Sequence, residues 1–240
     1  MKHPLFLIYC TIALIINTAQ ATTQQELAFI KSFIPESSLI FDVGAHHGLK
    51  TDIYLAHNAT VICIEPQPSC LKILRKKYKN NQKVVIVPQG LSNISGTMKL
   101  YICDTAPTIS TFSTEWQHGR FENYTWGKTV PVPVTTLDHL IKKYGIPYFC
   151  KIDVEGFEEM VLKGLSTPIP VVSFEFTKEF FKNSKSCIQY LENLGYKNFN
   201  YTLGENLQFI HASPLTSIEL TQEIEASADR LLWGDIYATY

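Results

Sequence analysis

Residues 38–48 read Ser-Leu-Ile-Phe-Asp-Val-Gly-Ala-His-His-Gly, an apolar run followed directly by a turn that contains two glycines. The run has the length of a buried strand, and apolar residues then recur at helical spacing at Leu49, Ile53 and Ala56. A strand, a glycine turn and a helix in this order are typical of a parallel sheet covered by helices. The stretch therefore predicts an α/β fold that begins near residue 38.

The same alternation of elements continues to the end of the chain and indicates one α/β domain. Further strands are expected at 60–64, 83–87, 97–103, 130–134, 148–152, 171–176, 197–202, 207–211 and 234–239. Further helices are expected at 66–78, 137–144, 155–162, 186–194 and 215–227, with Thr136 as the N-cap of the helix over 137–144.

Composition excludes two classes of protein. The chain has 240 residues, of which 45% are hydrophobic, so it can bury one substantial core. A charged fraction of 18% and a net charge of −1 argue against intrinsic disorder and against an electrostatic nucleic-acid binder.

The N-terminal residues have the sequence pattern of a targeting signal. The apolar run Leu5–Ile16 follows Lys2 and precedes the small-residue sequence Asn-Thr-Ala-Gln-Ala at 17–21. This pattern predicts a signal peptide over residues 1–21 and export to the periplasm or the medium. The run is shorter than the ~20 residues that span a bilayer, which favours a cleaved signal peptide. The alternative is an uncleaved N-terminal membrane anchor, which would be the only expected contact with a membrane. Residues 22–240 would then form the domain.

Residues 104–128 show no periodicity and are rich in Ser, Thr and aromatic side chains. So long an irregular stretch inside a compact domain is usually functional or mobile, and we interpret it as a lid-like loop over a substrate. Its aromatic side chains either stack on a sugar or form a satellite core beneath the loop.

The five cysteines after residue 21 have unrelated spacings and include no C-x-x-C pair. They predict neither a zinc site nor a disulfide framework. They are Cys63, Cys70, Cys103, Cys150 and Cys187.

The turn at 42–48 lies between a strand and a helix, where cofactor-binding loops occur, but it lacks the known nucleotide-binding motifs. Glycines stand only at 44 and 48, so the G-x-G-x-x-G fingerprint is absent, and no Gly-Lys-Ser/Thr follows. Glu65 ends the second strand, where an acidic residue holds ribose hydroxyls in dinucleotide-binding sheets. Acidic ends on two strands and a glycine turn suit a ligand with an amino-acid end and a nucleoside end, such as S-adenosylmethionine.

Four blocks of sequence, in this order, resemble the FkbM family of S-adenosylmethionine-dependent methyltransferases. They are Phe-Asp-Val-Gly-Ala at 41–45, Ile-Glu-Pro at 64–66, Thr-Leu-Asp at 136–138 and, most distinctive, Lys-Ile-Asp-Val-Glu-Gly at 151–156. The resemblance covers residues 38–178. It implies a class I methyltransferase fold, a doubly wound and mostly parallel sheet of seven strands. It also implies O-methylation of a hydroxyl on a small molecule, for example a sugar, a glycan or a secondary metabolite.

The resemblance also assigns the cofactor site. Asp42, Gly44 and Gly48 would surround the methionine part of the cofactor, Glu65 would hold its ribose, and Ser92 would flank its adenine. The sequence departs from the family pattern at His46-His47, where the family more often has Asn and small residues. Two imidazoles there would narrow the pocket.

Asp153 is the expected catalytic base or acceptor-orienting group, because ligands bind at the carboxyl ends of strands in open α/β sheets. The alternative is that Asp153 caps the next helix. Glu155, two residues on, either points the same way or sits in the first helical turn. For Lys151 we expect a structural ion pair with Glu175 or Asp138 rather than catalysis.

Two further possibilities concern a metal ion and a second base. Asp153 and Glu175 offer oxygen ligands to a hard divalent cation, but no third ligand is evident, so no metal site is predicted. His118 in the loop is an alternative base, whereas His139 is expected to be an ordinary helix residue.

A rival function belongs to another class. S-adenosylmethionine is a cytosolic metabolite, so an exported chain would need a supply of it. The rival is an exported binding protein that keeps the fold and has lost catalysis.

Overall fold

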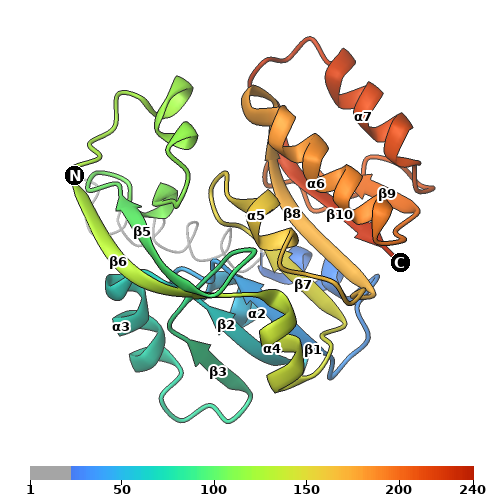
Figure 1. Ribbon diagram of the computed structural model, residues 1–240. Helices are drawn as coiled ribbons and strands as arrows, with labels where there is room; N and C mark the ends of the chain where they lie inside the picture. The colour runs from blue at the N-terminus through green and yellow to red at the C-terminus, as the bar shows by residue number, and fades with distance from the viewer. Residues whose placement is uncertain (1–22) are drawn as a thin grey trace, which may run out of the picture.

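A seven-stranded sheet runs through the computed structural model, which describes residues 23–240 (Figure 1). Its strands lie in the order β3-β2-β1-β7-β8-β10-β9, and within this sheet only β10 runs antiparallel to its neighbours. The order confirms the doubly wound, mostly parallel sheet of a class I methyltransferase. The strands are β1 (Leu39–Val43), β2 (Thr60–Ile64), β3 (Val84–Val87), β7 (Phe149–Ile152), β8 (Val171–Thr177), β9 (Asn198–Tyr201) and β10 (Trp233–Thr239).

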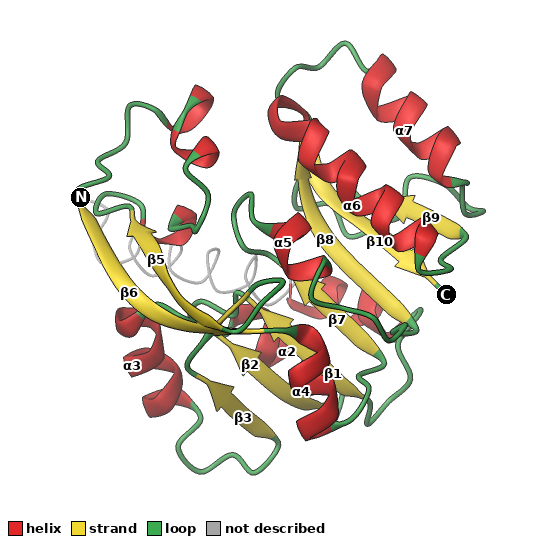
Figure 2. Cartoon of the chain, viewed as in Figure 1, coloured by secondary structure: helices red, strands yellow, loops and turns green. Residues whose placement is uncertain are grey.

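Helices cover both faces of this sheet (Figure 2). On one face, α4 (Leu137–Tyr144), α5 (Glu158–Leu162), α6 (Phe181–Asn193) and α7 (Ser217–Ala226) supply apolar side chains to the larger core. On the other face, a helix over residues 23–31 packs with α2 (Leu49–Ala56) and α3 (Pro68–Lys77). Burial on both faces explains why the central strands are almost wholly apolar.

A second, three-stranded sheet lies beside the main one and is formed by β4 (Gly90–Leu91), β6 (Lys128–Thr135) and β5 (Gly96–Ile102). The strands predicted over 97–103 and 130–134 pair with each other here. Between them, the lid-like loop contains short 3₁₀ turns at Pro107–Ile109, Glu115–Gln117 and Gly119–Phe121.

Two aromatic side chains of the loop are buried. Phe112 packs with Leu100, Val132 and Val134 of the second sheet. Trp116 packs against Phe121 and Phe180. These two side chains therefore form satellite cores beneath the loop, whereas the movement of the loop as a lid remains a prediction.

Three expectations about secondary structure were wrong. The helix predicted over 155–162 begins at Glu158, because Glu155 and Gly156 adopt positive φ angles of 57° and 84° that a helix does not accept. Its N-cap is Phe157, so Asp153 does not cap it. The helix predicted over 186–194 starts earlier, at Phe181.

The third error is the strand predicted over 207–211. There the Asn200 side chain bonds both the N–H and the C=O of His211, which holds the segment as a loop beside β9.

The predicted signal peptide over residues 1–21 lies outside the described residues. Within residues 23–240, no helix combines the length and the apolar character needed to cross a membrane.

The N-cap of α4 gives a test of the local structure. The Thr136 hydroxyl accepts the N–H of His139 at 3.1 Å, so Thr136→Ala should lower the free energy of unfolding by about 1 kcal/mol in urea titrations. Thr136→Ser keeps the hydroxyl and should recover most of the loss. Equal stability of Thr136→Ala and the wild type would refute the capping role.

Candidate active site

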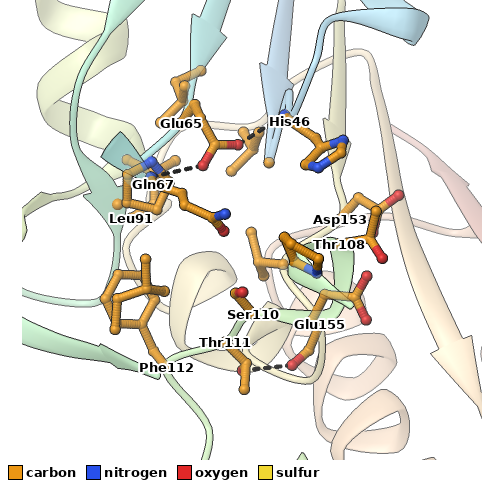
Figure 3. Close-up of a pocket in the computed structure, with 18 residues that line it drawn as sticks. His46, Glu65, Gln67, Leu91, Thr108, Ser110, Thr111, Phe112, Asp153 and Glu155 are labelled. Atoms are coloured by element: carbon orange, nitrogen blue, oxygen red, sulfur yellow. Dashed lines mark hydrogen bonds between the residues drawn. The ribbon is translucent and has the colours of Figure 1, made fainter. Parts of the chain in front are cut away.

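A pocket of about 520 Å³ opens where the carboxyl ends of β1, β2 and β7 meet (Figure 3). Its walls include Gly44 and His46 from the turn after β1, Glu65 from the end of β2, and Asp153 and Glu155 from the segment after β7.

The turn after β1 is held against both neighbouring strands. The N–H groups of Gly44 and Ala45 donate to the Ile64 carbonyl at 2.9 and 3.2 Å, and the Asp153 N–H donates to the Val43 carbonyl at 2.9 Å. A Cβ atom on residue 44 would lie 1.8 Å from the Asp153 carbonyl oxygen, and φ there is +83°. Residue 44 must therefore be glycine for the turn and β7 to approach each other.

Glu65 is buried and held by two backbone groups. Its Oε2 accepts the His46 N–H and its Oε1 accepts the Gln67 N–H, both at 2.8 Å (Figure 3). Burial raises the pKa of Glu65 to about 7, although the two hydrogen bonds act in the opposite direction. Each carboxylate oxygen keeps a second lone pair with which it can accept a hydroxyl of a ligand.

Asp42, another predicted cofactor residue, does not line this pocket. Asp42 is buried behind the turn, accepts the Thr51 hydroxyl, and lines a hollow that adjoins the pocket and shares Gly44 and His46 with it. Burial raises the pKa of Asp42 to about 6.

Gly48 and Ser92 do not line the pocket. The Gly48 carbonyl accepts the Tyr78 hydroxyl at 2.8 Å, and a Cβ on Gly48 would meet that hydroxyl at 2.5 Å. Ser92 is buried, and its N–H donates to the Thr135 carbonyl at 2.9 Å. Its neighbour Leu91 forms the pocket wall instead.

Lys151 forms the structural ion pair that the sequence suggested, but with other partners. Its buried Nζ lies 2.7 Å from Asp235 Oδ1 on β10 and 3.2 Å from Asp153 Oδ2. The predicted partners Glu175 and Asp138 were wrong, since Asp138 instead accepts the Ser166 N–H. These carboxylates raise the pKa of Lys151 well above 10.5 despite its burial, so the ammonium stays charged.

Asp153, Glu155 and Glu175 form one acidic cluster, in which a carboxylate oxygen of each lies within 4.8 Å of the others. Glu155 is thus the third carboxylate that was not evident from the sequence. Burial, and next the charge of Asp153, raise the pKa values of Glu155 and Glu175 well above 4.5. The cluster therefore retains a proton at neutral pH more readily than isolated carboxylates do.

Several wall residues were not identified from the sequence. The loop supplies Thr108, Ser110, Thr111 and Phe112, and the Thr111 hydroxyl donates to the Glu155 carbonyl at 2.7 Å. Gln67 joins them from the segment after Glu65. The sequence offered one indication of its role, because it lies two residues after Glu65, the residue predicted to hold the ribose. His118 is exposed and His139 lies on α4, and neither lines this pocket.

Glu158 gives the segment after β7 a pH-dependent stability. Its buried Oε1 accepts the N–H groups of Val154 and Gly156 at 3.1 and 3.2 Å, and burial raises its pKa to about 7. A carboxyl whose pKa is higher in the folded than in the unfolded chain stabilises the fold at low pH. That stabilisation is lost as the pH rises from about 4.5 to 7.

We therefore expect Glu158→Gln to weaken the fall in stability between pH 4.5 and 8 by up to roughly 3 kcal/mol. Urea titrations at both ends of this range measure the difference, with the exposed Glu225→Gln as the matched control. A wild-type pH dependence in Glu158→Gln would contradict the burial of a charge at this position.

Comparison with known proteins gives one match to a family. Residues 42–197 match the model of the methyltransferase FkbM domain, which is well over half of the chain. Comparison with curated protein sequences gave no match.

Solved structures that resemble the fold include three methyltransferase-type proteins. Precorrin-6y C5,15-methyltransferase from Geobacter metallireducens is 11% identical with a TM-score of 0.48, covering 90% of this chain and 86% of that one. The ribosomal protein L11 methylase from Lactobacillus delbrueckii is 9% identical with a TM-score of 0.46, covering 92% and 79%. Fibrillarin from Aeropyrum pernix, solved with S-adenosylmethionine, is 10% identical with a TM-score of 0.44, covering 86% and 68%.

The family match, on a sheet with the class I strand order, shows that this chain belongs to the FkbM family of S-adenosylmethionine-dependent methyltransferases.

Proposed function

We propose that the chain methylates a hydroxyl oxygen of a small molecule, such as a sugar, a glycan or a secondary metabolite. The observation that carries this proposal is the position of Asp153 and Glu155. Both carboxyl groups face the same pocket as Glu65 and the glycine turn, so proton-accepting groups stand beside the cofactor residues (Figure 3).

The residues of the pocket fit S-adenosylmethionine. Glu65 offers carboxylate oxygens to the ribose hydroxyls, and Gly44 leaves the backbone of the turn open to the amino-acid end. Leu91 and Gln67 offer an apolar surface and an amide to the adenine. When bound, the cofactor supplies a methyl group on a positively charged sulfur, which needs no further activation.

The chain itself then has two tasks, to place the acceptor oxygen in line with the methyl group and to take its proton. Asp153 lies beside the Lys151 ammonium, and 39% of its side chain is exposed, so an acceptor hydroxyl can reach it. Burial raises the pKa of Glu155, so this carboxyl keeps a proton more readily and can orient an acceptor hydroxyl through a hydrogen bond. We assign the proton transfer to Asp153, with Glu155 as the group that orients the acceptor.

Binding of S-adenosylhomocysteine tests the cofactor site without an acceptor. Calorimetry should detect binding to the wild type, and Glu65→Gln should weaken it by about tenfold, because the amide loses the charge that strengthens its hydrogen bonds. Glu225→Gln, far from the pocket, should bind as the wild type does. Absence of binding to the folded wild type would refute the cofactor site, and full affinity in Glu65→Gln would refute the role of Glu65.

Turnover tests the base. Release of S-adenosylhomocysteine is measured with hydroxyl-rich glycan and metabolite extracts as acceptors. Asp153→Asn should lower kcat by about 10²–10⁴-fold while its affinity for S-adenosylhomocysteine stays within twofold of the wild type. A larger loss in Glu155→Gln than in Asp153→Asn would exchange the two roles.

The same assay separates the enzyme from its rival. An exported binding protein without catalysis would bind S-adenosylhomocysteine yet release none with any acceptor. Release that requires Asp153 would exclude that rival.

A further inference from the structure

The fold brings the side chain of a distant cysteine next to those of two adjacent histidines. His46 and His47 stand in the turn after β1, and Cys70 stands in the first turn of α3. One imidazole nitrogen of each histidine and the thiol sulfur lie within 4.8 Å of one another. They meet because β1 and β2 are adjacent and parallel, so the segments that follow both strands emerge at the same edge of the sheet.

One potential ligand atom of this group, on His46, has no partner among residues 23–240. His46 Nε2 is buried and has no hydrogen-bond partner within the described part of the chain. Such a buried polar atom costs free energy until something binds it. The two rings stack with their centroids 3.7 Å apart and their planes 23° apart.

Cys70 is the third potential ligand. Its thiol forms no disulfide, and the residue is only 1% exposed. The other two side chains reach into the hollow that adjoins the cofactor pocket. Two imidazoles and one thiol therefore converge between the turn and α3, and the hollow that the two histidines line also contains Asp153 and Glu155 of the acidic cluster.

We propose that His46, His47 and Cys70 bind a transition-metal ion of the class that prefers nitrogen and sulfur ligands, such as Zn²⁺. Two imidazoles and a thiolate match that class, whereas Mg²⁺ and Ca²⁺ require oxygen ligands. On binding, the metal–sulfur bond replaces the S–H bond, and the thiol proton leaves to the solvent. Three protein ligands leave a fourth position for water or another small ligand.

Metal binding requires the two imidazole rings to leave their stacked arrangement. Ligand atoms around a tetrahedral zinc ion lie about 3.5 Å apart, as follows from Zn–N and Zn–S bonds of roughly 2.0–2.3 Å. The atoms here lie within 4.8 Å of one another, but the in-plane lone pairs of the two stacked rings are nearly parallel, so the rings must rotate out of their stack before both reach one ion. Because His46 also lines the cofactor pocket, the metal would fix one of that pocket's side chains.

Cobalt titration tests the site independently of catalysis. The untagged, metal-free chain should take up one equivalent of Co²⁺ with a thiolate-to-cobalt charge-transfer band, which excess Zn²⁺ removes. Cys70→Ser should abolish that band. His47→Ala should keep it but weaken Co²⁺ binding at least tenfold. Cys187→Ser, which alters a buried cysteine on α6, is the matched control and should behave as the wild type.

Failure of the wild type to bind Co²⁺, or persistence of the band in Cys70→Ser, would overturn the proposal. If Cys70→Ser does not fold, His47→Ala carries the test, and unchanged Co²⁺ affinity in that variant would overturn it equally. Binding of S-adenosylhomocysteine, measured separately, distinguishes failure of the metal site from failure of the cofactor site.

Discussion

The turn after β1 passes so close to the end of β7 that a single Cβ atom on residue 44 would collide with the backbone of Asp153. This contact sets the width of the active-site edge. It brings the acidic residues after β7 next to Glu65 at the end of β2, and the hydrogen bonds from the turn to Ile64 hold that side in place. The proposed positions of the donor and the acceptor both follow from this one close approach.

Around that contact, burial rather than charge pairing controls the electrostatics. One buried ammonium, that of Lys151, lies between Asp153 and Asp235, whereas Glu155 and Glu175 share the same region without a cation of their own. Their raised pKa values are the consequence. Glu155 also holds a positive φ, a backbone conformation that costs energy for a residue with a side chain and that is common at functional sites. The segment is thus shaped for its position in the pocket at some cost to stability.

The parts of the fold that local signals determine were predictable from the sequence. The apolar runs at 39–43 and 60–64 and the Thr136 cap gave correct elements, because burial and capping leave direct marks on the sequence. The start of α5 was not predictable, since the left-handed conformation at Glu155 is imposed by its surroundings.

Partners distant in the sequence were harder still. Asp235 on β10 pairs with Lys151 across 84 residues of sequence. No sequence motif predicts an ion pair over that distance. Cys70 shows the same limit, because the sequence has no metal-binding spacing and only the parallel pairing of β1 and β2 brings it to the two histidines. For the pocket, position along the strands predicted Gly44 and Glu65, which both line it, whereas Leu91 lines it in place of the predicted Ser92.

The most direct test of the account is a crystal structure of the chain with S-adenosylhomocysteine. The account predicts the ribose hydroxyls at the Glu65 carboxylate, the amino-acid end at the turn after β1, and the sulfur on the side of the pocket that carries Asp153. A ligand bound elsewhere, or in the reverse orientation with its sulfur far from Asp153, would contradict it.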